Sequence, residues 1–191
     1  MTADRKDIGE TASRVAAYRD YLCLLVRLQL AAQWATKIDV SGVVQQTLWE
    51  ASRSPLPEPD SDLLACLRRI LANNLRDEIR RQTRAKRDVR REISLDAALD
   101  ESSQRIEGWL VGQTSTPSQR LVRMDELCRL AAALAGLSED QRRVVELHHL
   151  QGIPIAITAE RLGRTKEATS ALLYRALKRL RERLDQRGET T

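Results

Sequence analysis

The spacing of apolar residues in the C-terminal third of the chain predicts helices. Apolar positions recur every three to four residues after Ser138, and Gln141 completes a capping-box signature with that serine. The pattern stops at Gly152, so a first helix is predicted over residues 138–150. A short second helix is predicted over residues 154–162, because its first residue is a proline, which suits a first helical turn.

A glycine turn joins this short helix to a third one. Gly163 ends the second helix, and Thr165 is the predicted N-cap of a third helix whose apolar stripe continues to Leu184. Two helices that meet at a glycine turn are typical of a helix-turn-helix, and Ala159 leaves room for their close approach. Residues 161–187 contain nine Lys or Arg against three acids. This excess favours phosphate contacts over an ordinary pair of packed helices.

The N-terminal half carries the same helical periodicity. A first helix is predicted over residues 11–36 and a second one after Asp39, its predicted cap. The proline-rich stretch 54–62 then predicts a loop, which Asp60 or Ser61 is predicted to end, and a long helix follows over residues 63–92. Residues 67–91 hold ten Lys or Arg against three acids, a net charge of +7. We interpret this face as a nucleic-acid contact and not merely as a solvated helix surface.

A different composition separates the two halves. Residues 92–119 carry about four net negative charges and are rich in Ser, Thr and Gly. We therefore predict an acidic flexible linker over residues 93–116, with helix resuming at Thr116-Pro117. Together with the low aromatic content of 3%, the patterns predict an all-α protein of two small helical domains, 8–92 and 117–187.

Overall composition narrows the function classes. The formal charge of +5 and the pI near 9.4 favour a polyanionic partner. No apolar run approaches the roughly twenty residues that cross a bilayer, and the first ten residues lack a signal-peptide core, so a cytoplasmic location without a membrane segment is expected. Cys23, Cys66 and Cys128 are far apart in the sequence and are expected to be buried free thiols.

An enzyme is disfavoured by the residues that the chain lacks. His148 and His149 are adjacent, so on a helix they diverge by about 100° and do not chelate a metal as an i, i+4 pair would. No nucleophile elbow, glycine-rich phosphate loop or acidic metal cluster is present in the sequence. We expect no catalytic residue, no metal site and no cofactor.

Several fixed spacings in the C-terminal segment agree with one known family. They involve Leu137, Gln141, Arg142, Gly152, Ala159, Gly163 and the basic stretch from Arg175 to Arg183. In this combination the segment resembles region 4 of the bacterial sigma-70 family, specifically of its extracytoplasmic-function (ECF) group. The resemblance implies binding to the polymerase β flap and to the minus-thirty-five promoter element as a duplex. The residues implied for DNA binding are Arg164, Thr165, Lys166, Glu167, Ser170, Tyr174 and Arg175.

The N-terminal half resembles sigma region 2. The family pattern D-x-x-D-L-V-Q-x-x-F meets Asp39, Gly42, Val43, Val44, Gln45 and Leu48. The pattern A-W-L-x-R-I-x-x-N meets Ala65, Cys66, Leu67, Arg69, Ile70 and Asn73. The first pattern implies docking on the β′ clamp of core RNA polymerase through Asp39, Val43, Gln45 and Gln46.

The second pattern leads into the part of region 2 that opens the minus-ten element. The resemblance implies that Asn73 holds a base flipped out of the non-template strand. It further implies that four arginines hold phosphates of that strand, namely Arg76, Arg80, Arg81 and Arg84. In the linker, Trp109 and Leu110 either pack on a neighbouring domain or sit in a channel of the polymerase.

Some positions depart from the family pattern. Gly42 replaces an acidic residue and Cys66 replaces a tryptophan. Thr158 and Thr169 stand where the family usually buries Ile and Val, so their hydroxyl groups need hydrogen-bond partners. Ser170 and Leu172 occupy positions where Lys and Arg are common, so base recognition on this helix must differ.

The resemblance implies a sigma factor that directs core RNA polymerase to specific promoters and initiates transcription, with an anti-sigma factor as a further candidate partner. The alternative is a stand-alone helix-turn-helix regulator that acts as a dimer without polymerase. The basic face of the N-terminal half favours the first function, since a dimerisation or sensing surface has no need for one.

Overall fold

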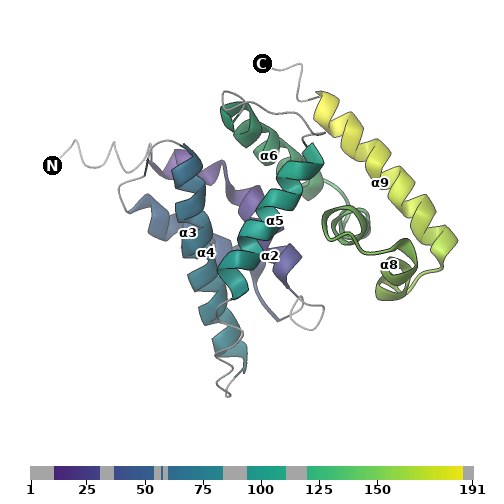
Figure 1. The fold of residues 1–191 in the computed structure, drawn as a ribbon, viewed down its shortest axis with the longest axis horizontal. Coiled ribbons are helices and arrows are strands. Elements are labelled where there is room, and N and C mark those ends of the chain that lie inside the picture. Colours follow the sequence, from purple (N-terminus) through teal and green to yellow (C-terminus); the bar gives the residue numbers. More distant parts are fainter. Residues whose placement is uncertain are drawn as a thin grey trace.

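The part of the chain described by the computed structural model is built from helices and contains no strand (Figure 1). Residues 11–30, 37–53, 57, 60–83, 94–110 and 120–186 are described. After a helical stretch at 11–16, the elements are α2 (Arg19–Gln29), α3 (Val40–Ser52), α4 (Asp60–Thr83), α5 (Ser94–Leu110), α6 (Arg120–Ala135), α7 (Glu139–Val145), the π-helical turn η3 (Glu146–Leu150), α8 (Ile155–Leu162) and α9 (Lys166–Gln186). The all-α prediction is confirmed. Across these residues, no helix has the length and apolar character that spanning a membrane requires.

Helix α2 lies at the centre of the first half of the chain. Its six consecutive residues from Tyr21 to Val26 are all buried, because α3, α4, α5 and α6 pack around it. The single helix predicted over residues 11–36 is wrong in extent. A turn interrupts it at residues 17–18, where the Tyr18 amide donates to the Val15 carbonyl at 3.1 Å, and the extended backbone of Leu30 (ψ 114°) ends α2.

Helix α5 occupies most of the segment that was predicted to be a flexible linker. Leu99 and Ile106 of this helix are fully buried. The Tyr21 hydroxyl donates to Ser103 Oγ at 2.8 Å, and Gln29 Nε2 donates to Ser102 Oγ at 2.6 Å. The prediction of flexibility is therefore corrected for residues 94–110, because apolar and small polar side chains at helical spacing give this acidic segment a face that packs on α2.

The remaining linker predictions fall outside the described residues. This applies to residues 111–116, to the helix start at Thr116-Pro117, and to the side chains of Trp109 and Leu110.

The two halves of the chain share one continuous hydrophobic core. Leu127, Leu130 and Leu134 of α6 are buried in the same cluster as the α2 leucines. Figure 1 shows α5 between the first group of helices, α3 and α4, and the pair formed by α8 and α9. The halves are therefore in direct contact, while the domain boundaries 8–92 and 117–187 remain predictions.

The local signals at the helix ends are confirmed in the C-terminal half. Ser138 is the N-cap of α7, and both hydrogen bonds of its capping box with Gln141 are present. Gly152 and Gly163 have φ values of 68° and 62°, a left-handed conformation that favours glycine and ends each helix. The helix predicted over 138–150 does not stay α-helical, because its last five residues form the π-helical turn η3.

All three cysteines are free, as expected, but only Cys23 is buried. Cys66 and Cys128 are half-buried, so the prediction of burial is wrong for these two.

Candidate nucleic-acid interface

Helix α9 has one buried face and one exposed face. Thr169, Leu172, Ala176 and Leu180 face the core and are at most 8% exposed. On the opposite face, Tyr174 is 73% exposed. The seven residues predicted to contact the minus-thirty-five element all lie on the solvent side, at Arg164, Thr165, Lys166, Glu167, Ser170, Tyr174 and Arg175. The structure therefore brings these side chains together on one accessible surface.

Polar contacts fix the start of α9. Thr165 Oγ1 accepts a hydrogen bond from the Ala168 amide at 3.2 Å, which satisfies one of the free N–H groups of the first turn. Arg164 Nη2 forms an ion pair with Asp140 of α7 at 2.6 Å. Arg175 Nε donates to the Ala171 carbonyl at 3.3 Å. Arg164 is thus already paired, whereas Lys166 has no ion-pair partner in the described part of the chain.

The two buried threonines of the helix-turn-helix, Thr158 and Thr169, satisfy their hydroxyl groups within their own helical turns. Thr158 Oγ1 donates to the Pro154 carbonyl at 3.1 Å, and Thr169 Oγ1 donates to the Thr165 carbonyl at 2.8 Å. Both side chains are fully buried. The prediction that these hydroxyls need partners is confirmed, and no other helix has to supply an acceptor.

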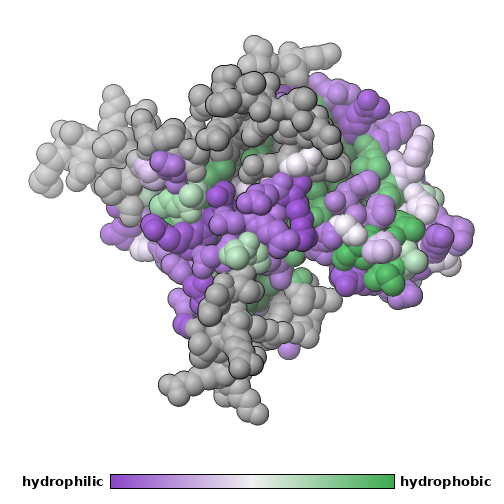
Figure 2. Space-filling view, viewed as in Figure 1, coloured by the Kyte–Doolittle hydropathy of each residue, from purple (hydrophilic) through white to green (hydrophobic). Residues whose placement is uncertain are grey.

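The surface around the helix-turn-helix is amphipathic. Figure 2 shows hydrophilic residues along α9 and hydrophobic residues gathered over α8. Ile157 of α8 is 41% exposed in this region. A duplex that lies against α9 would therefore meet a charged and hydroxylic surface bordered by an apolar one.

Helix α4 carries the second predicted DNA surface. Asn73 is exposed, and its Oδ1 accepts a hydrogen bond from Arg76 Nη1 at 2.7 Å. Arg80 and Arg81 are 58% and 75% exposed, and each pairs with an acid of its own helix. The structure brings these four side chains onto α4, while Arg84 lies outside the described residues.

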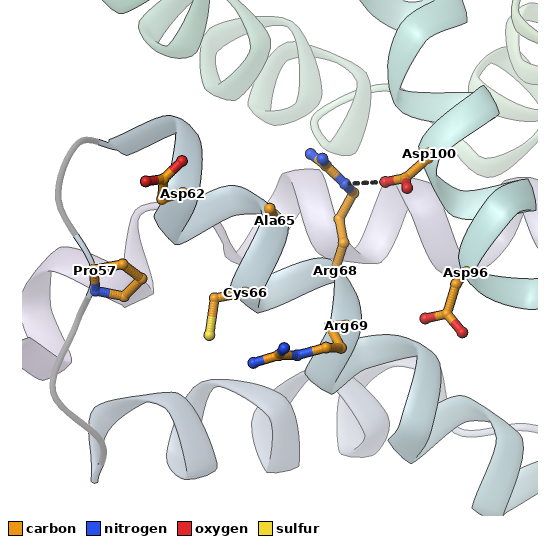
Figure 3. Close-up of a pocket in the computed structure, with 8 residues that line it drawn as sticks. All are labelled: Pro57, Asp62, Ala65, Cys66, Arg68, Arg69, Asp96 and Asp100. Carbon is orange, nitrogen blue, oxygen red and sulfur yellow. Dashed lines mark hydrogen bonds and ion pairs between the residues drawn. The ribbon is translucent and has the colours of Figure 1, made fainter.

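Acidic residues of α5 pair with the arginines of α4. Arg76 Nη2 lies 2.9 Å from Asp96 Oδ2. Arg68 Nε lies 2.6 Å from Asp100 Oδ1, and Figure 3 shows this second pair. A hollow of about 540 Å³ next to these pairs is lined in part by Cys66, at the position where the family has a tryptophan. The spacing of residues within α4 did not predict these contacts with α5. The opposite net charges of the two segments were the signal that could have predicted them.

Helix α3 presents the residues predicted to bind polymerase, with one difference. Asp39 is the exposed N-cap of α3, although its side chain makes no capping hydrogen bond. Gln45 and Gln46 are also exposed, and Gln46 Nε2 donates to Glu50 Oε1 at 2.6 Å. Val43, however, is only 7% exposed and packs in the core, so the structure does not bring its side chain to this surface.

Trp49 was not predicted to be part of this surface. Its indole is 53% exposed, and the Arg53 guanidinium lies 4.6 Å from the ring centroid. The signal in the sequence was a large apolar residue placed off the buried stripe of α3. An exposed tryptophan beside Gln45 and Gln46 is the kind of side chain that anchors protein interfaces.

The absence of a side chain at Gly42 has a local consequence. A Cβ atom at this position would lie 2.7 Å from Oδ2 of Asp39. The Asp39 carboxylate therefore occupies space that an acidic residue at position 42 would need, and it places a negative charge at the same end of α3.

Comparisons with known proteins agree with this geometry for the C-terminal half. The family model described as "Sigma-70, region 4" matches residues 129–180, which include the second part of α6 from Arg129 onward, all of α7, η3 and α8, and α9 as far as Leu180. This segment is similar to region 4 and supports a relationship with the sigma-70 family. The comparison with curated proteins found no match for the chain.

Proposed function

We propose that this protein is a sigma factor that directs core RNA polymerase to specific promoters and initiates transcription. The observation that carries the proposal is the match of residues 129–180 to sigma-70 region 4, together with the exposed polar and basic face of α9 inside that match. Lys166, Glu167 and Tyr174 are the side chains proposed to contact the minus-thirty-five element in the major groove and on its backbone.

The N-terminal half supplies the second part of the proposal. Asn73 is proposed to hold a flipped base of the minus-ten element, while Arg76, Arg80 and Arg81 neutralise phosphates of the same strand. The exposed positions of Asn73, Arg80 and Arg81 on α4 support this role, whereas Arg76 is 20% exposed and is paired with Asp96. Asp39, Gln45 and Gln46 of α3 are proposed to contact the polymerase clamp. With both modules present, the chain would belong to the extracytoplasmic-function group.

Run-off transcription tests the proposal. Purified core polymerase is combined with the wild-type chain or with Asn73→Ala on a library of promoter fragments from the source genome. The wild type is expected to start transcripts at discrete sites, and Asn73→Ala is expected to lose them while it still binds core polymerase. Gln82→Ala is the matched control, because Gln82 is an exposed amide on the same helix that bonds only to Glu78 among the described residues.

A different set of results would contradict the sigma-factor proposal and favour the alternative function. A chain that neither binds core polymerase nor starts transcripts, but shifts duplex DNA as a dimer, would be the stand-alone regulator instead.

A further inference from the structure

A cavity of about 620 Å³ lies at the junction of the two halves of the chain. Its lining comes from α2, α3, α7, η3 and α8, so residues far apart in the sequence meet around it. The volume falls in the range of about 300–1,000 Å³ that small-molecule sites occupy. Nothing in the proposed contacts with promoter DNA or polymerase uses this space.

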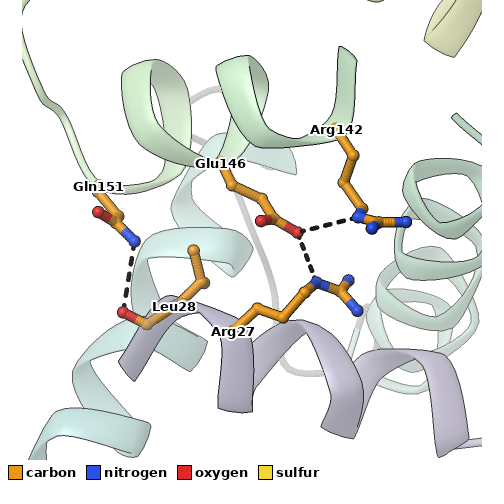
Figure 4. Close-up of polar contacts among 5 residues, drawn as sticks. All are labelled: Arg27, Leu28, Arg142, Glu146 and Gln151. Carbon is orange, nitrogen blue, oxygen red and sulfur yellow. Dashed lines mark hydrogen bonds and ion pairs between the residues drawn. The ribbon is translucent and has the colours of Figure 1, made fainter. Parts of the chain in front are cut away.

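The charged groups of the cavity do not balance. Its described lining includes four arginines and two glutamates, Arg27, Arg142, Arg143, Arg161, Glu139 and Glu146. Arg27 Nε and Arg142 Nε lie 2.8 Å and 3.8 Å from the same oxygen, Oε1 of Glu146. Figure 4 shows both guanidinium groups on one side of this carboxylate. One negative charge therefore faces two positive charges at this point.

Unused donors remain around the cavity. Arg27 Nη2 is buried without a hydrogen-bond partner among the described residues. Arg143 and Arg161 form no ion pair within the same part of the chain. Native proteins leave few buried donors unsatisfied, and each such group is a sign of a missing acceptor, such as an ion. Two guanidinium groups from α7 and α8 thus lack an anionic partner among the described residues, and the Arg27 guanidinium, although paired with Glu146 through Nε, keeps Nη2 as an unused donor.

We propose that this cavity binds a small phosphate-bearing molecule. A phosphate ester carries close to two negative charges and several strong acceptor oxygens, which match the surplus of two positive charges and the geometry of guanidinium donors. Leu28, Val40 and Leu147 line the same cavity and offer an apolar surface for the rest of the ligand. The proposal goes beyond the proposed function and stands whether or not the chain initiates transcription.

Titration calorimetry on the whole 191-residue chain tests this site. The probes are inorganic pyrophosphate and adenosine 5′-monophosphate, with adenosine as the uncharged control. Saturable binding of one phosphate probe per chain is expected for the wild type, and adenosine is expected to bind much more weakly. The double variant Arg143→Gln/Arg161→Gln is expected to lose at least about tenfold in affinity for the phosphate probes, since it removes two charge-assisted donors.

A second double variant, Lys178→Gln/Arg179→Gln, removes the same charge from the exposed face of α9, outside the cavity. It is expected to bind the phosphate probes as the wild type does. Equal weakening in both double variants would mean that only the overall charge matters, and this would overturn the proposal. The absence of saturable binding up to about 10 mM probe, a level weaker than ordinary specific sites, would overturn it as well.

Contact with duplex DNA is the alternative role for Arg143 and Arg161. If Arg143→Gln/Arg161→Gln weakens duplex binding but leaves pyrophosphate binding unchanged, these arginines belong to the DNA surface and the cavity proposal fails. Run-off transcription with the wild type gives an independent result, so a failure of the sigma-factor proposal remains distinguishable. Arg27 is left intact in these variants because it takes part in the buried contact with Glu146.

Discussion

At the scale of single residues, Thr169 shows how a buried hydroxyl is tolerated in α9. Its Oγ1 donates to the Thr165 carbonyl, and the same carbonyl already accepts the Thr169 amide at 3.0 Å. Thr169→Val removes the hydroxyl, leaves the carbonyl satisfied and buries one more methyl group. We expect the free energy of unfolding to rise by about 0.5–1 kcal/mol in urea denaturation.

The companion variant Thr169→Ser separates the two contributions. It keeps the hydroxyl and deletes the buried methyl group, so the free energy of unfolding should fall by about 1 kcal/mol. A destabilised Thr169→Val would show instead that the hydroxyl bond is worth more than the added apolar burial.

Glu146 makes stability depend on pH. Burial raises the pKa of this carboxyl above its ordinary value of 4.5. The positive charge and the hydrogen bond of nearby Arg27 lower the pKa and offset this rise only in part. The folded state therefore binds the proton more tightly than the unfolded chain, and this contribution to stability is lost as the pH rises from about 4.5 through the raised value. Urea denaturation between pH 4 and pH 7 should show this loss for the wild type and not for Glu146→Gln. Parallel curves for the two proteins would contradict the assignment.

At the scale of helices, acidic residues of α5 pair with arginines of α4, one of which, Arg76, is proposed to bind a DNA phosphate. Asp96 and Asp100 are more than half exposed, and surface ion pairs of this kind contribute at most about 1 kcal/mol to stability. Asp96→Asn/Asp100→Asn should therefore leave the fold nearly as stable while it frees Arg76 and Arg68 for phosphate. In fluorescence anisotropy at low salt, the affinity for single-stranded minus-ten DNA is expected to rise by about two- to fivefold, with a steeper salt dependence.

Glu101→Gln is the control for the double variant Asp96→Asn/Asp100→Asn. Glu101 lies on the same helix and is exposed, but it pairs with Arg105 of α5 and not with α4. Its replacement should change DNA affinity less than the double variant does. Equal gains in both proteins would point to net charge and not to the α4–α5 contacts.

Helices that carry their own start and stop signals could be predicted from the sequence. The capping box at Ser138 and the turns at Gly152 and Gly163 depend on a few neighbouring residues, so local patterns were sufficient. Helix α5 was missed because its acidic, Ser-rich composition is typical of a linker. The segment forms a packed helix because Leu99 and Ile106 are buried against helices that lie far away in the sequence.

For the candidate surfaces, too, local sequence patterns predicted some features, and contacts between distant segments determined the others. Helical periodicity predicted an apolar stripe on α9, and Leu172, Ala176 and Leu180 of that stripe are buried. Ion pairs such as Arg27–Glu146 and Arg76–Asp96 join segments 119 and 20 residues apart, and the spacing of residues within one helix carries no information about such partners. The burial of Val43 agrees with the helical spacing of apolar residues after Asp39, whereas the resemblance assigned Val43 to a binding surface that its side chain does not reach.

At the scale of the whole molecule, the shared core sets a condition on the proposed function. Promoter elements centred near minus ten and minus thirty-five are separated by about 85 Å of duplex, at roughly 3.4 Å per base pair. In the structure, α2 and η3 touch through the 2.8 Å contact between Arg27 and Glu146. Simultaneous contact with both elements would therefore require the two halves to part, at the cost of the apolar surface that α6 buries against α2.

The shared core predicts that the isolated chain unfolds as one cooperative unit. Thr169→Ser weakens only the C-terminal half directly, so independent domains would leave the N-terminal half unaffected. With a common core, hydrogen exchange of the slowest amides in α2 and α4 should accelerate by about the same factor as in α9, because all of them then exchange through global unfolding. Acceleration confined to α7, α8 and α9 would instead show two independent units, as the sequence pattern had predicted. In that case, the contact between Arg27 and Glu146 would be weak enough to open without unfolding either half, and promoter binding would face no large energetic cost from the closed arrangement.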